Sequence, residues 1–206
     1  VTQKMGTDVA LLNGIMNVIL ENGWQDQSFI DEHTEDYDAF IKVVEQFTPE
    51  KASEICGVAA DDIRSIAKAY ATVDKASIIY CMGITQHTTG VDNVKSLANL
   101  TMMTGSLGKE SSGLNPLRGQ NNVQGACDMG GLPNVFTAYQ PVTSTAAAEK
   151  FAKAWGVDTL STEVGLTIPY MLEGIENDTV KALYVVGENP VVSDPDVTHV
   201  KKAMEK

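Results

Sequence analysis

The chain has 206 residues, of which 43% are hydrophobic, which is enough for a core in one domain or in two small lobes. Its formal charge of −12 argues against duplex DNA or an anionic membrane surface as a partner, because binding phosphate groups requires clustered Lys and Arg. No apolar stretch approaches the length of a membrane span, and no secretory signal is recognisable.

Cysteine and histidine are few and scattered. The three cysteines, Cys56, Cys81 and Cys127, form no C-x-x-C pair, so the sequence predicts neither a disulfide framework nor a structural zinc site. The three histidines are equally isolated, and no metal ligands are predicted among these residues. Such usage favours a reducing, cytoplasmic setting, with the periplasm as the alternative if an export signal precedes the chain.

The first third of the chain is helical in pattern. A helix is predicted from an N-cap at Asp8 to Gly23, and a second, strongly acidic one over 28–47, whose DEHTEDYD run indicates a solvated face. Thr48 followed by Pro49 is a typical helix start, and another helix is predicted from residue 60 or 61.

Two short apolar runs, 77–81 and 182–186, are each predicted to be a buried strand. The first is followed by a glycine-bearing turn and a helix from about residue 92 to Gly105. Between Gly105 and about residue 140 there is almost no helical or strand period, and a loop of that length is uncommon unless it is functional. Further helices are predicted over about 144–155, 167–176 and from Val197 to the end.

Helices that alternate with strands predict an α/β fold with parallel sheets flanked by helices. Ligands bind such sheets outside the carboxyl ends of the strands, which here are the CMGITQ and VVGENP segments. In CMGITQ, Gly83 permits close backbone approach and Gln86 offers an amide, although an ordinary β–α turn explains the same residues. The same ambiguity holds for GENP, where Asn189 precedes a proline.

The central loop is harder to explain without a ligand. Its glycines and amide side chains could wrap a polar, multi-ring molecule, and it carries a single charge between Ser111 and Cys127, that of Arg118. A guanidinium is a fork-shaped donor for a carboxylate or phosphate. The alternative for Arg118 is a structural salt bridge to a distant acid. His87 has no acid adjacent in sequence to orient it, so a structural histidine is favoured over a base.

Three segments together resemble the catalytic alpha subunit of molybdenum- or tungsten-dependent formate dehydrogenases, which bind bis(molybdopterin guanine dinucleotide). They are YCMGITQHTTG, the run from Asn99 to Val135 that contains RGQNNVQGACDMG, and LYVVGENP. The likeness extends from GTDVALLNG through the last helix and so covers nearly the whole chain. It implies a fold of Rossmann-like lobes, as in the formate dehydrogenase and DMSO reductase family.

The resemblance also implies roles for particular residues. Arg118 matches the arginine that orients formate beside the metal, and Gln120 matches a residue beside the pterin. The matches to cofactor contacts are Met82, Gly83 and Gln86 after the first strand, Gly6, Thr7 and Asp8 at a guanine contact, and Gly187, Glu188 and Asn189 in GENP. The implied reaction is oxidation of formate to carbon dioxide.

The departures from the family pattern are equally informative. The cysteines that bind a 4Fe-4S cluster and the metal-ligating cysteine or selenocysteine belong upstream of the matched stretch, and a cap domain belongs downstream. The chain is therefore expected to be an internal fragment, inactive alone. It should comprise the C-terminal part of one cofactor-binding α/β domain (1–120) and part of a second, pseudo-symmetric one (121–206). The expected partners are formate, the remaining domains and electron-transfer subunits. The alternatives are another molybdopterin oxidoreductase, such as one acting on nitrate, or a non-catalytic cofactor-binding module.

Overall fold

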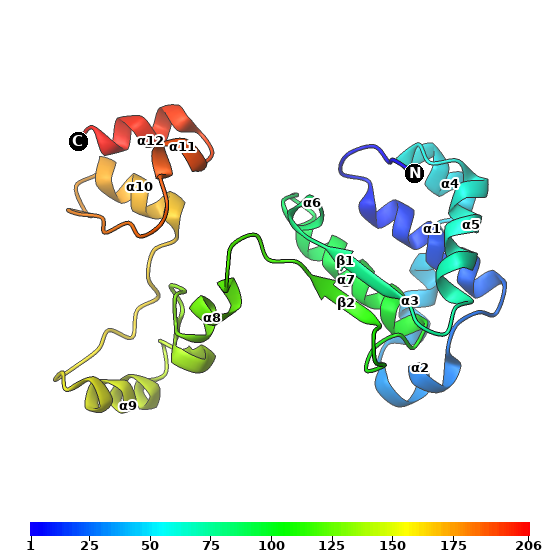
Figure 1. Ribbon diagram of the computed structural model, residues 1–206, viewed down its shortest axis with the longest axis horizontal. Coiled ribbons are helices and arrows are strands. Elements are labelled where there is room, and N and C mark those ends of the chain that lie inside the picture. The colour runs from blue at the N-terminus through cyan, green and yellow to red at the C-terminus, as the bar shows by residue number, and fades with distance from the viewer. The chain divides into compact units, whose positions relative to one another are not determined.

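A computed structural model describes all of residues 1–206. The chain folds into two compact units, Val1–Gly119 and Gln120–Lys206. Both units combine helices with short strands, so the fold is mixed α/β, as the sequence predicts, with helix predominating (Figure 1). No helix is at once long enough and apolar enough to span a membrane.

The N-terminal unit is built around one central helix. Its first five helices are α1 (Asp8–Glu21), α2 (Gln27–His33), α3 (Tyr37–Val44), α4 (Pro49–Cys56) and α5 (Ala60–Ala71). Helix α1 packs against α4, α5 and α7 (Gly90–Met103), and its Met16 and Ile19 are fully buried together with Ile63 of α5. The predicted start at Thr48 is confirmed, since its hydroxyl accepts a hydrogen bond from the Lys51 backbone N–H and Pro49 begins the helix.

The acidic stretch forms two helices, so the prediction of one continuous helix over 28–47 is wrong. Helix α2 ends at His33, Thr34 is extended, and Asp36 is left-handed with φ 56°. Like charges three or four residues apart destabilise a helix, and this run places several carboxylates at that spacing. The acidic side chains are solvent-exposed, as predicted.

The first strand lies where it was predicted. Strand β1 (Ser77–Tyr80) pairs in parallel with β2 (Gly113–Pro116), and α6 (Met82–Thr85) and α7 connect them. The prediction that this strand is buried is only half right, because Ile79 is 64% exposed. In this chain helices cover one face of the two-stranded sheet, so alternate side chains, Ile78 and Tyr80, pack on the core while Ile79 faces outward.

The C-terminal unit contains five α-helices, one 3₁₀ turn and two short strands. They are α8 (Val123–Asp128), β3 (Val135–Phe136), the 3₁₀ turn η1 (Thr137–Tyr139), β4 (Gln140–Pro141), α9 (Thr145–Trp155), α10 (Ile168–Glu176), α11 (Pro190–Ser193) and α12 (Val197–Met204). Helices α9, α10 and α12 confirm the predictions for 144–155, 167–176 and the region from Val197. Strands β3 and β4 form an antiparallel hairpin.

Two further expectations, for residues 105–140 and for residues 182–186, are not met. The stretch between Gly105 and residue 140 contains β2, α8 and the hairpin, which are too short to produce a periodic pattern. The segment 182–186 forms no strand, and its Tyr184 is 94% exposed. An apolar β-branched run becomes a strand only when a neighbouring strand hydrogen-bonds to its backbone, and no segment of this chain does so.

A charge cluster joins the last helix of the C-terminal unit to α10. Glu176 accepts a hydrogen bond from the Lys202 ammonium at 2.9 Å and lies 3.4 Å from the His199 ring. The Lys202 hydrogen bond, and then the charges of Lys202 and His199, hold the pKa of Glu176 below its ordinary value of 4.5. This stabilisation is therefore complete above about pH 4.5 and is lost as the pH falls through the lower pKa of the folded state.

We expect the C-terminal unit to lose part of its stability on acidification because Glu176 is protonated. Thermal unfolding followed between pH 6 and pH 3 should show a decline that is smaller in Glu176→Gln, which removes the titrating carboxylate. Glu173→Gln is the control, because this exposed acid of α10 has no ion pair and should leave the wild-type decline unchanged. An unaltered decline in Glu176→Gln would contradict the assignment.

Candidate functional site

The carboxyl ends of β1 and β2 lie at the same edge of the small sheet. Tyr80, the last residue of β1, is in register with Pro116, the last of β2, and the Leu117 backbone N–H donates to the Tyr80 carbonyl at 2.8 Å. The segments that carry Met82 and Arg118 therefore leave the sheet from one edge. This is the edge at which parallel α/β sheets bind ligands.

Helix α6 gathers three predicted cofactor contacts in one turn. The Gln86 backbone N–H donates to the Met82 carbonyl at 2.9 Å, and the Gln86 amide lies 3.4 Å from the Met82 sulfur. Met82 is 51% exposed. A Cβ built on Gly83 would meet no atom within 4 Å, so the backbone there is open to a ligand.

His87 follows this turn and has a structural role. Its Nε2–H donates to the Gly83 carbonyl at 3.0 Å, and this hydrogen bond closes the turn. The interpretation of His87 as a structural histidine is therefore confirmed. The ring helps to fix the backbone of Gly83, one of the predicted cofactor contacts.

Arg118 is exposed and lies in the extended segment that follows β2. Gln120 is exposed as well and begins the C-terminal unit, two residues before the N-cap of α8. That N-cap is Asn122, whose side chain accepts a hydrogen bond from the Gly125 backbone N–H at 3.1 Å. The structure therefore places Arg118 at the same sheet edge as the α6 turn, and it places Gln120 in the other unit.

The segment Gly6–Asp8 opens the N-terminal unit at the start of α1. Gly6 adopts a left-handed conformation with φ 77°, and Thr7 occupies the N-cap position. The prediction that Asp8 caps the helix is wrong, because Asp8 is already helical and one of its oxygens, Oδ1, accepts from the Gln3 amide instead. Its other oxygen, Oδ2, is buried and has no hydrogen-bond partner.

Such an orphan carboxylate oxygen is costly unless a ligand donates to it. Asp8 as a whole is only 6% exposed, so water cannot reach this oxygen freely, whereas a carboxylate on the surface would be hydrogen-bonded to water. The structure thus leaves an acceptor available at one of the positions for which the family resemblance implies a guanine contact.

The GENP segment lies in the C-terminal unit. Gly187 is left-handed with φ 71°, the Glu188 carboxylate accepts from the Ser193 hydroxyl at 3.0 Å, and the Asn189 carbonyl accepts from two N–H groups of α11. Asp194 also belongs to this group, although sequence reasoning did not single it out. Burial, and then the neighbouring Glu188 charge, raise the pKa of Asp194 above its usual range.

Apart from Gln120 at the start of the C-terminal unit, the predicted contacts fall into three groups, at the sheet edge, at the start of α1 and at GENP. The chain holds no cluster of three or more His, Cys, Asp or Glu side chains that could bind a metal ion. Each group contains a glycine, Gly6, Gly83 or Gly187, at which an added Cβ would meet no atom within 4 Å. The backbone at each group is therefore open to close approach by a ligand.

Comparison with known proteins relates nearly the whole chain to one group of proteins. The chain is 52% identical over 97% of its length to the F420-dependent formate dehydrogenase subunit alpha of Methanocaldococcus jannaschii, and 45% identical over 98% to formate dehydrogenase H of Escherichia coli. It spans 29% and 28% of those two proteins. In structure it resembles acetylene hydratase from Pelobacter acetylenicus, with a TM-score of 0.68 over 98% of the chain at 17% identity, a likeness of fold alone.

The family model for molybdopterin oxidoreductases matches residues 1–206, which is every residue of the chain. The match includes the sheet edge with Arg118, the buried carboxylate of Asp8 and the GENP segment. The chain therefore belongs to the molybdopterin oxidoreductase family.

Proposed function

We propose that this chain forms part of the cofactor and substrate pocket of a formate dehydrogenase alpha subunit. The observation that carries the proposal is the identity of 45–52%, over nearly all of the chain, to alpha subunits and enzymes that are named formate dehydrogenases. The reaction is oxidation of formate to carbon dioxide, which releases one proton and two electrons. Those electrons pass to subunits or domains outside this chain.

Arg118 is the residue we assign to formate. A guanidinium donates two parallel hydrogen bonds to a carboxylate, so it fixes both the position and the plane of a one-carbon acid. Held in this way, formate presents its C–H bond in one direction, which lowers the entropic part of the barrier. The sheet-edge location supports the role, because the α6 turn with its open Gly83 backbone leaves the sheet there too.

The residues present fit a molybdopterin dinucleotide. The open backbone at Gly83 can approach a flat ring system, and the unpaired Asp8 oxygen can accept from the N–H groups of guanine. We assign the sheet edge and Gly6–Asp8 to one dinucleotide, and Gln120 with Gly187–Asn189 to the second of a bis-dinucleotide centre. When bound, that centre supplies the molybdenum or tungsten that accepts the two electrons of formate.

The proposed function is tested with the full-length protein that contains this chain. Formate should reduce an artificial dye through the purified enzyme, whereas nitrate should not reoxidise the reduced dye. Nitrate-dependent oxidation without formate activity would assign the protein to another reaction of the same family. The isolated 206-residue chain serves as the background control, and we expect no formate-dependent reduction from it.

Asp8→Asn is expected to weaken retention of the cofactor. The change keeps the size of the side chain but replaces one acceptor oxygen with an N–H donor that opposes the guanine donors. Guanine nucleotide released from the acid-treated full-length protein should fall about ten-fold, which corresponds to the loss of about 1.4 kcal/mol. Full guanine content in the variant would contradict the contact.

Asp61→Asn provides the matched control for this measurement. Asp61 is also an acid in the first turn of a helix, α5, but it is exposed. The control therefore loses the same favourable interaction with the helix dipole without removing a buried acceptor. It should retain the wild-type guanine content.

A further inference from the structure

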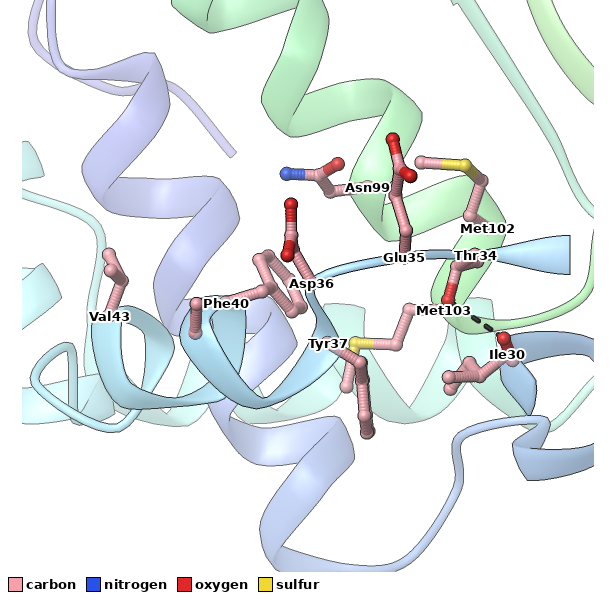
Figure 2. A pocket seen from close by; sticks show the side chains of 11 residues that line it. Ile30, Thr34, Glu35, Asp36, Tyr37, Phe40, Val43, Asn99, Met102 and Met103 are labelled. Atoms are coloured by element: carbon pink, nitrogen blue, oxygen red, sulfur yellow. Dashed lines mark hydrogen bonds between the residues drawn. The ribbon is translucent and has the colours of Figure 1, made fainter.

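A cavity of about 390 Å³ opens in the N-terminal unit beside α3 (Figure 2). Its walls are the loop between α2 and α3, helix α3 itself and the C-terminal half of α7. None of the residues assigned to formate or to the cofactor lines it. Its volume lies within the range of pockets that hold small molecules, and a hollow of this kind differs from the flatter patches that bind proteins.

The floor of the cavity is apolar and adaptable. Ile30 and Met103 are buried, at 3% and 2% exposure, and Phe40 contributes a ring that is half-buried. Met102 adds a second flexible thioether beside Met103, and methionine pairs adjust to ligands of different shape. A bound molecule would therefore place an apolar body against this floor.

Polar groups gather at one side of the cavity. Figure 2 shows the side chains of Glu35 and Asp36 pointing the same way from the loop, while Asn99 extends across from α7, and all three line the cavity. Glu35 and Asp36 are exposed. These three side chains form no hydrogen bond or ion pair within the chain, so their oxygens are available to a ligand.

The charge at this rim is uncompensated. No Lys, Arg or His lines the cavity, whereas two carboxylates do. An anionic ligand would be repelled, and a neutral one would leave the carboxylates unused. A positive group is attracted by both acids, and Phe40 below can contribute a cation–π contact.

We propose that this cavity binds a small organic cation, an ammonium group carried on an apolar chain or ring. The apolar body packs on Ile30, Phe40 and the methionine pair, while the ammonium donates to Glu35, Asp36 and the Asn99 carbonyl oxygen. The site is independent of the formate reaction, because it shares no residue with it.

The test uses the full-length protein that contains this chain, with ¹³C-labelled methionine methyl groups observed by NMR. n-Hexylammonium should shift the Met102 and Met103 signals saturably, and the other methionines, such as the buried Met16, serve as internal references. Hexan-1-ol has the same apolar body without the charge, and it should bind about ten-fold more weakly.

The double variant Glu35→Gln with Asp36→Asn removes both charges. Asn tolerates the left-handed backbone that Asp36 adopts, so the loop should keep its conformation. The preference of the cavity for hexylammonium over hexanol should fall about ten-fold and so disappear. The control is Asp38→Asn with Glu45→Gln, which removes two exposed acids at either end of α3 that do not line the cavity. That control should keep the preference.

Several outcomes would overturn the proposal. Equal affinity for hexylammonium and hexanol, or a preference that survives in the double variant, would show that the carboxylates do not select the ligand. Unshifted Met102 and Met103 signals would show that no ligand enters. Shifts produced by a lysine-containing peptide but not by hexylammonium would assign the cavity to a polypeptide partner instead.

Discussion

Replacing Arg118 with Lys in the full-length protein is expected to lower kcat/KM for formate about 100-fold. Lysine keeps the positive charge but replaces a planar fork with a point charge, so formate retains its attraction and loses its fixed plane. The loss of orientation acts on the oxidation step, because the C–H bond is then held in many directions. Steady-state kinetics with formate and an artificial dye measure the effect.

Arg64→Lys is the matched control, since Arg64 is the other arginine of the chain. It is exposed on α5 and forms ion pairs with Glu50 and Asp61, remote in sequence from the sheet edge. Exposed ion pairs contribute little, so we expect wild-type kinetics. If Arg118→Lys also had wild-type kinetics, Arg118 would not be the formate contact.

Gly90→Ala is expected to destabilise the N-terminal unit by about 2 kcal/mol or more. Gly90 is buried at the start of α7, and a Cβ there would overlap the backbone carbonyl oxygen of Thr85 in α6. Backbone cannot swing aside as a flexible side chain can. The α6 turn would have to move away from α7, against the hydrogen bond from the buried Asn93 amide to the Ile84 carbonyl.

Because the same turn carries Met82 and Gly83, this variant should also lose cofactor in the full-length protein. Urea unfolding of the 206-residue chain measures the stability change, and metal content of the full-length protein measures the loss of cofactor. Gly83→Ala is the stability control, since a Cβ at that position meets no atom within 4 Å. Its unfolding midpoint should stay at or slightly above the wild-type value. Equal midpoints for Gly90→Ala and the wild type would contradict the packing argument.

Local signals explain the parts of the fold that the sequence predicts correctly. Two helices begin directly after a residue of the capping type, Thr48 before Pro49 and Ser144 before an apolar helical pattern. Each side chain accepts a hydrogen bond from the backbone N–H three residues further on. The prediction of a single helix over 28–47 fails because Ile30 and Tyr37, on either side of residues 34–36, keep helical spacing while the acidic run between them interrupts the helix. Periodicity indicates which face of a helix is apolar, and it does not reveal the three-residue break between α2 and α3.

Strands are harder to predict than helices, because a strand depends on a hydrogen-bonding partner that is distant in sequence. Residues 113–116, GLNP, carry no strand pattern, yet they pair with β1 through the backbone. The run 182–186 has the pattern and no pairing. The candidate site follows the same logic. The turn after β1 is predictable from the strand alone, whereas the position of Arg118 at the same sheet edge depends on how β1 and β2 pair.

Burial of single polar atoms is likewise a tertiary property. Asp8 was identified by resemblance, but its unpaired buried oxygen is visible only in the structure. Asp194 has no sequence signal that separates it from the chain's other acids, and its raised pKa comes from burial beside Glu188. Neither feature follows from composition or spacing.

The most direct measurement is an experimental structure of the full-length enzyme with its cofactor and formate bound. The account predicts that the Arg118 guanidinium donates two hydrogen bonds of about 2.8 Å to the formate oxygens, at the edge where β1 and β2 end. Formate bound elsewhere, with Arg118 paired to one of the protein's own carboxylates, would contradict it.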